Sequence, residues 1–228
     1  GMGIMHKKNY FLLAEILLMM ALTSACSAGQ KAEARPKSPQ SAVSGKESVL
    51  PVTGPLEMLF YSGAGAWGSM LTLNPDGSFE GEYFDENYYD KDMIQVYVCQ
   101  YHGQFGNIEK LTDASWRLTL EDLELDTGRS VGEVWEDTDG EYTIHYIAGE
   151  PGGFCGKDQV ALPPGAQFLL YSPEAAGHEP GTELYGATEF LFWENTHQEF
   201  TSEEDVLGCW GLRNLATEEG FFTEKSER

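Results

Sequence analysis

The chain has 228 residues, and 41% of them are apolar, which is enough to form the core of one large domain or two small ones. Its formal charge is −23, from 37 acidic and 14 basic residues. Such a surface repels phosphate backbones, so nucleic acid is not an expected partner. Acidic surfaces suit basic peptides, cations or solubility alone.

Residues 1–25 have the pattern of a signal peptide. Lys7 and Lys8 form a short positive region, and an apolar run follows from 10 to 22 with one interruption, Glu15. The run is shorter than the ~20 apolar residues of a membrane-spanning helix. We therefore expect a targeting segment rather than a transmembrane anchor.

Cys26 follows this segment directly, in the stretch Leu-Thr-Ser-Ala-Cys that ends at residue 26. The stretch resembles the lipobox of bacterial lipoproteins. The resemblance implies that the Cys26 thiol takes up a diacylglyceryl group and that Cys26 becomes the new N-terminus. Two or more acyl chains hold a protein stably at a membrane, since each buried methylene contributes about 0.8 kcal/mol. A lipid anchor on the extracytoplasmic face of the cell membrane is the expected location, with ordinary secretion and a cytosolic protein as alternatives.

Residues 26–50 have the composition of a flexible tether. They are rich in Ser, Ala, Gly and Pro and contain no aromatic residue. The tether carries a charge of +2, whereas residues 51–228 hold 8 basic and 34 acidic residues. Beside an anionic membrane, the tether would be attracted to the lipid headgroups and the acidic domain repelled from them.

From residue 51 onward the apolar pattern has a period of two, which is typical of β-strands. In residues 67–83 one face collects Trp67, Ser69, Leu71 and Leu73 before a turn, and Phe79, Gly81 and Tyr83 after it. The turn at 74–77 has proline in its second position and glycine in its fourth, which predicts a type I turn that closes a hairpin.

Further strands are predicted along the rest of the chain. Residues 115–121 should point Trp116, Leu118 and Leu120 inward, and 132–147 should form a hairpin that turns at 137–140. Other candidate strands are 95–105, 167–171 and 206–212, and 183–196 is either a short helical turn or a strand. Regularly spaced short strands predict a mostly β fold, with residues 51–228 forming a single antiparallel barrel or sandwich.

Three cysteines remain beyond Cys26, so at most one disulfide is expected among them. Cys155 with Cys209 is the preferred pair, because both lie near glycines in expected loops or strand ends. Three unpaired thiols are the alternative. A zinc site is not expected, because no two cysteines lie close together in the sequence and no histidine stands at ligand spacing from one.

No catalytic motif of the hydrolases, metalloproteases or phosphate-binding enzymes is present, and no cofactor is expected. The histidines at 102, 145, 178 and 197 are scattered and fit surface or strand positions. The acidic stretch 85–92 lacks the glycine and glutamate of a calcium-binding EF-hand loop and is interpreted as a solvated loop between strands. Paired carboxylates could serve a hydrolase, so enzymatic function stays open but is not favoured.

Aromatic residues make up 12% of the chain and should mostly fill the core. A wide barrel could instead leave a pocket lined by inward aromatics. Gly65-Ala66-Trp67 resembles the Gly-x-Trp of lipocalins, and the resemblance implies that Arg213 stacks on Trp67. The irregular stretch 149–165 departs from that family, so the resemblance is to calycins in general. The candidate ligand-binding residues are Trp67, Trp116, Tyr142 and Arg213.

The arrangement of lipobox, Ser/Ala-rich tether and the pattern W…L.L..DG.F.G at 67–81 resembles uncharacterised envelope lipoproteins of Clostridia-type bacteria. This resemblance implies a location in the cell envelope, and it implies no activity. We expect a membrane-anchored extracytoplasmic module that binds a small-molecule or peptide ligand. An envelope hydrolase with paired carboxylates and a purely structural lipoprotein are the alternatives.

Overall fold

The computed structural model describes six stretches of the chain: residues 49–62, 65–90, 93–139, 142–178, 184–192 and 202–224. The predicted signal peptide, the predicted lipid attachment at Cys26 and nearly all of the predicted tether lie outside these stretches. Within them, no helix is long and apolar enough to cross a bilayer.

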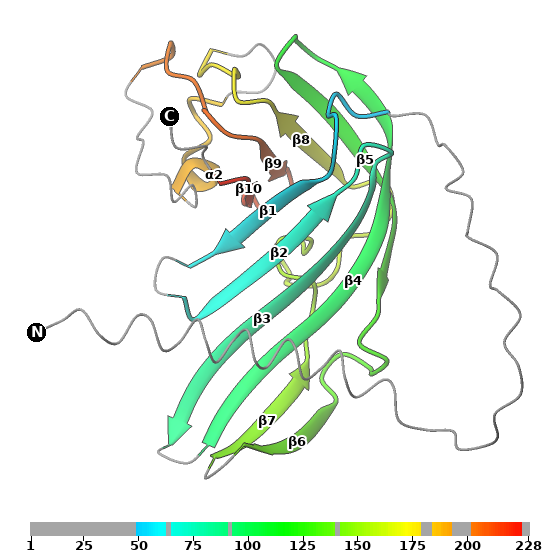
Figure 1. Ribbon diagram of the computed structural model, residues 1–228, viewed down its shortest axis with the longest axis vertical. Coiled ribbons are helices and arrows are strands. Elements are labelled where there is room, and N and C mark those ends of the chain that lie inside the picture. The colour runs from blue at the N-terminus through cyan, green and yellow to red at the C-terminus, as the bar shows by residue number, and fades with distance from the viewer. Residues whose placement is uncertain are drawn as a thin grey trace, which may run out of the picture. The chain divides into compact units, whose positions relative to one another are not determined.

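Strands dominate the described part of the chain (Figure 1). In chain order the elements are β1 (Leu56–Tyr61), β2 (Trp67–Leu73), β3 (Ser78–Asp90), β4 (Met93–Lys110), β5 (Ser115–Leu125), β6 (Val134–Asp139), β7 (Tyr142–Ala148), β8 (Gln167–Tyr171), α2 (Thr188–Phe192), β9 (Gly211–Asn214) and β10 (Gly220–Phe222).

Eight of the strands form a closed antiparallel barrel, in the order β3-β2-β1-β10-β9-β8-β5-β4, and the pairing of β3 with β4 completes the ring. The prediction of a single antiparallel β domain is confirmed, and the barrel is found rather than the sandwich. Strands next to each other in the ring are also consecutive in the chain once the β6–β7 hairpin is left out. This up-and-down order is consistent with a calycin-like fold.

The first hairpins follow the predicted alternation. Leu71, Leu73 and Phe79 point into the barrel and are almost fully buried, and Ser69 is buried on the same face. The predicted turn is present between β2 and β3, where the Gly77 amide donates to the carbonyl of residue 74 at 2.9 Å. Gly77 has a φ of +83°, a conformation that favours glycine over other residues.

Side chains from all around the ring fill the barrel interior. The buried cluster consists of Leu50, Val52, Met58, Phe60, Leu71, Leu73, Phe79, Cys99, Tyr101, Phe105, Trp116, Leu118, Leu120, Phe154, Leu162, Phe168, Leu170, Leu212 and Phe221. Phe154 lies between β7 and β8, in the irregular stretch 149–165, and its exposed fraction is 0%. Its ring centroid is 4.8 Å from that of Phe79, 5.1 Å from that of Phe168 and 5.3 Å from that of Tyr101. This stretch, which we call the plug, therefore enters the barrel and occupies its centre.

A second apolar cluster lies on the outside of the wall formed by β8, β9 and β10. Leu169 and Tyr171 of β8 point outward there, and Phe190 of α2 packs on them, with its ring centroid 5.7 Å from that of Tyr171. Figure 1 shows α2 beside β9 and β10. Residues 183–196 thus contain a short helix, one of the two predicted forms, and the helix covers this part of the wall.

Long strands carry part of the sheet beyond the barrel (Figure 1). β5 pairs only with the second half of β4, from Tyr101 onward. On this side, the main-chain N–H and C=O groups in the first half of β4 therefore need another strand as their partner. β7 pairs with that edge in parallel over Met93–Val98, and β6 pairs with β7. We call this extension, made of β6, β7, the first half of β4 and the facing part of β3, the wing.

Several local predictions were wrong here. The predicted turn at 137–140 is wrong, because Asp137, Thr138 and Asp139 are still paired with β7. Most of the acidic stretch 85–92 is strand and not loop, since β3 pairs with β4 as far as Asp90. The parallel β4–β7 pairing was not expected, and only the last two residues of 206–212 belong to β9.

Candidate functional site

His102 lies at the centre of an acidic region on the outer surface of the barrel. It points outward from the middle of β4, and strand pairing places Glu80 of β3 on one side of it and Glu124 of β5 on the other. The same pairing continues through Thr72 of β2 to Glu57 of β1, whose carboxylate accepts a hydrogen bond from the Thr72 hydroxyl at 3.0 Å. These five residues, the acidic row, cross five neighbouring strands.

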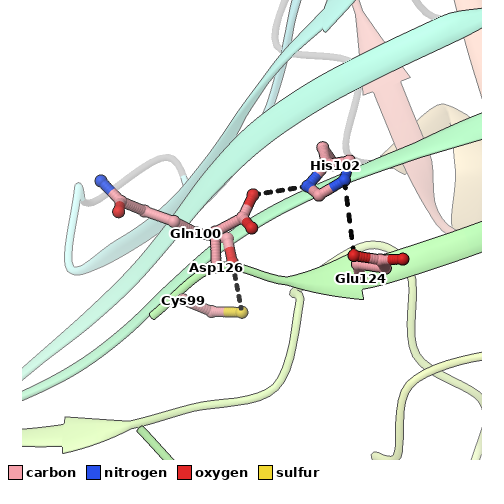
Figure 2. A network of polar contacts seen from close by, with 5 residues as sticks. All are labelled: Cys99, Gln100, His102, Glu124 and Asp126. Atoms are coloured by element: carbon pink, nitrogen blue, oxygen red, sulfur yellow. Dashed lines mark hydrogen bonds and ion pairs between the residues drawn. The ribbon is translucent and has the colours of Figure 1, made fainter. Parts of the chain in front are cut away.

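The histidine ring is held between two carboxylates (Figure 2). Its Nδ1 lies 2.5 Å from Oδ2 of Asp126, and its Nε2 lies 3.7 Å from Oε2 of Glu124. Asp126 is itself positioned at the end of β5, where its amide donates to the Gln100 carbonyl at 2.7 Å. The Cys99 thiol donates to that same carbonyl at 3.7 Å, from the side of β4 that faces the barrel interior.

Electrostatics favour the protonated form of His102. The hydrogen bond with Asp126 is the largest effect and raises the pKa of His102; burial opposes it, and the charges of Asp126, Glu124 and Asp122 raise the pKa further. When protonated, His102 adds a positive charge to the acidic row. No group of three or more His, Cys, Asp or Glu side chains in the described stretches could hold a metal ion. The arrangement is suited to contact with basic or polar groups of a partner.

The structure places the four predicted ligand-binding residues in different environments. Trp67 points into the barrel, where its ring centroid lies 4.9 Å from that of Phe60, and Trp116 belongs to the interior cluster. Tyr142 lies in the wing, paired with Asp139, and its side chain is outside the described part. Arg213 lies in β9 of the barrel wall. Trp67 and Trp116 therefore share the barrel interior, and whether these residues bind a ligand stays a prediction.

The predicted stacking of Arg213 on Trp67 is wrong, because the two side chains occupy opposite faces of the barrel wall. Arg213 points outward, where it donates to the Tyr171 hydroxyl at 3.3 Å and forms an ion pair with Glu218. Its neighbour in β9, Leu212, points inward and belongs to the interior cluster. Strand alternation therefore turns Arg213 away from the face on which Trp67 packs.

The predicted disulfide between Cys155 and Cys209 is not formed. Cys155 belongs to the plug, and its carbonyl accepts a hydrogen bond from Asn214 at 3.0 Å. Cys209 is buried in the outer cluster with Tyr171. The barrel wall of β8 and β9 lies between the two residues, and no disulfide joins them.

A second set of ionisable groups lies around the plug. Burial raises the pKa of Cys99 and of Cys155 to about 12, and burial also raises the pKa of Tyr83, Asp85 and Glu219. The plug contacts this set directly, because Gly152 packs so closely on the Tyr83 ring that a Cβ there would clash with it. These groups stay neutral over a wider pH range than usual, which fits their place beside an apolar core.

Sequence reasoning did not find the acidic row. It treated His102 as one of several scattered histidines, because the carboxylates around it come from other strands. A signal was present, since Glu80 and Glu82 alternate on β3 as Asp122, Glu124 and Asp126 do around the end of β5. The sequence alone does not give the strand register that places these carboxylates beside His102.

Comparison with known proteins identifies no relative: no family model, no curated protein and no solved structure matches this chain.

Proposed function

We propose that this chain is a lipid-anchored extracytoplasmic binding protein, similar to the Clostridia-type envelope lipoproteins, that contacts a basic peptide or protein with the outer surface of its β-sheet, on the barrel or the wing, and not with the barrel interior. The filled interior is the observation that carries this proposal. Phe154 and the side chains around it occupy the space in which a barrel would hold a small ligand. Binding is therefore assigned to the outer surface.

The charge of the domain supports a basic partner. Residues 51–228 carry 34 acidic and 8 basic residues, and the acidic row concentrates carboxylates on one side of the barrel. A net field of this size attracts cationic partners over the Debye length, which is about 8 Å at physiological salt. Association should therefore weaken as salt is added.

The anchor is tested separately from the binding. Wild-type chain expressed in a bacterial host with lipoprotein maturation should sediment with membranes, and mass spectrometry should find a diacylglyceryl group on Cys26. Cys26→Ser should release the protein from the membrane fraction, whereas Ser44→Ala in the predicted tether should not. A wild-type protein with an unmodified Cys26 would overturn the anchor.

Binding is tested with two labelled peptides of equal length, one of alternating Lys and Ser residues and one of alternating Glu and Ser residues. Fluorescence anisotropy should report binding of the lysine peptide alone. The affinity should fall between 50 and 200 mM salt, because salt screens exposed charges that lie further apart than the Debye length, which is about 10 Å at 0.1 M. The structural-lipoprotein alternative expects no binding of either peptide. Equal binding of both, or of neither, would overturn the proposal.

A further inference from the structure

The outer strand of the wing, β6, has an open edge. In the described part of the chain β6 pairs with β7 on one side, and it is the last strand of the sheet order on the other. Strands in the barrel have neighbours on both sides because the ring is closed. An edge of this kind can pair with another extended chain.

The direction of the main-chain groups along β6 follows from the hydrogen bonds at its ends. The Ala148 amide of β7 donates to the Glu133 carbonyl at 2.9 Å, which makes residue 133 one of the positions bonded to β7. Bonded and non-bonded positions alternate in an antiparallel pair. Val134, Glu136 and Thr138 therefore direct their main-chain groups away from β7. The hydrogen bond of the Thr138 amide is consistent with this direction, because the amide donates to the Asp137 carboxylate at 2.7 Å and not to β7.

The side chains along this edge are apolar at its start and acidic further on. Val134 is 56% exposed, and the adjacent Trp135 is partly buried, with its ring stacked on Tyr146 at a centroid distance of 5.3 Å. Glu136 and Asp137 come next and are both exposed, one on each face of the strand. An added strand would thus meet apolar surface first and a carboxylate on either face after it.

We propose that β6 receives an extended basic segment of the partner protein as an additional strand of the wing. The inference rests on the proposed function and names its binding mode. Hydrogen bonds from Val134 and Glu136 would hold the segment's main chain, and Lys or Arg side chains would lie beside Glu136 and Asp137. A second copy of this chain fits the edge poorly, because pairing β6 with β6 brings these carboxylates together.

The test compares two variants of one residue, with a labelled octapeptide of alternating Lys and Val as the probe. Glu136→Pro removes the outward amide without breaking the β6–β7 ladder, since proline is tolerated on edge strands. Glu136→Gln removes the same charge and keeps the amide. We expect Glu136→Pro to weaken peptide binding about tenfold or more, which corresponds to at least 1.4 kcal/mol, and Glu136→Gln only a few-fold. Equal loss in both variants would overturn strand addition, since charge alone would then explain it.

Hydrogen exchange on the wild-type full chain provides a second measurement that does not depend on the variants folding. With the peptide bound, the amides of Val134 and Glu136 should exchange more slowly, and those next to His102 should not change. If protection appears around His102 instead, the edge proposal fails and binding through the outer barrel surface stands. If neither region is protected and the peptide does not bind, the proposed function fails as well.

Discussion

The ring of Phe154 stacks on the ring of Phe79, with the centroids 4.8 Å apart and the planes at 22°. Phe79 belongs to β3 in the barrel wall, and Phe154 belongs to the plug between β7 and β8. The contact therefore joins the barrel to a stretch without regular secondary structure. It also converts a fold that can hold a small ligand into one whose interior is occupied.

Replacing Phe154 with alanine should destabilise the protein strongly. Truncation of a fully buried phenylalanine costs about 3–5 kcal/mol of unfolding free energy, through lost burial and the cavity it leaves. Urea denaturation measures the change. Val160→Ala in the same plug is the matched control, because Val160 is half exposed and its truncation should cost less than about 0.5 kcal/mol. A loss for Phe154→Ala as small as the control's would show that the plug is not part of the core.

The strands were predictable because their signal is local. Trp116, Leu118 and Leu120 alternate in the sequence, and the structure points all three into the barrel as expected. The plug was not predictable, since no period marks it and Phe154 is buried by residues from distant strands. The same limit explains the wrong stacking of Arg213, whose position depends on which face of the wall it occupies.

The hydroxyls of Ser69 and Tyr101 form a hydrogen bond of 2.8 Å inside the barrel, and they should be energetically coupled. Tyr101→Phe or Ser69→Ala leaves the other hydroxyl buried without this bond, which costs about 1–3 kcal/mol. The double variant removes both hydroxyls, so its loss should be smaller than the sum of the two single losses. Urea denaturation of all four proteins gives the coupling. Strict additivity would show that the hydrogen bond does not contribute.

The buried thiols should make the protein sensitive to alkaline pH. Burial raises the pKa of Cys99 and Cys155 from 9.0 to about 12. Below pH 9 both thiols are protonated in the folded and the unfolded chain, so their contribution to stability is complete there. Between pH 9 and 12 only the unfolded chain releases these protons, and the free energy of unfolding should fall.

Urea midpoints at pH 8 and pH 10 measure this fall. Cys99→Ala should reduce the difference between the two midpoints relative to wild type, even though it lowers both of them. Native Cys99 and Cys155 should also react slowly with a thiol reagent at pH 8 and quickly in urea, because the thiolate is the reactive form. Rapid labelling of both thiols in the native protein would contradict their burial.

Asp126 should control the ionisation of His102. The hydrogen bond that His102 Nδ1 donates to the Asp126 carboxylate is the largest cause that raises the pKa of His102, so Asp126→Asn should lower that pKa toward 6.5. NMR titration of the ring protons reports the value directly. Glu121→Gln is the matched control, since it removes an exposed charge from the same region of β5 without contacting the ring, and it should leave the His102 titration nearly unchanged. Equal shifts in both variants would assign the effect to net charge rather than to the hydrogen bond.

The same interaction sets the sign of a small pH effect on stability. Because the folded pKa of His102 is raised, its contribution is complete below pH 6.5 and is lost as the pH rises through the folded value. Both partners are about half exposed, so solvent screening keeps the effect small. Wild type should therefore lose slightly more stability than Asp126→Asn when urea midpoints at pH 5.5 and pH 8 are compared. A larger loss in Asp126→Asn would show that the Asp126 carboxylate does not stabilise the imidazolium in the folded chain.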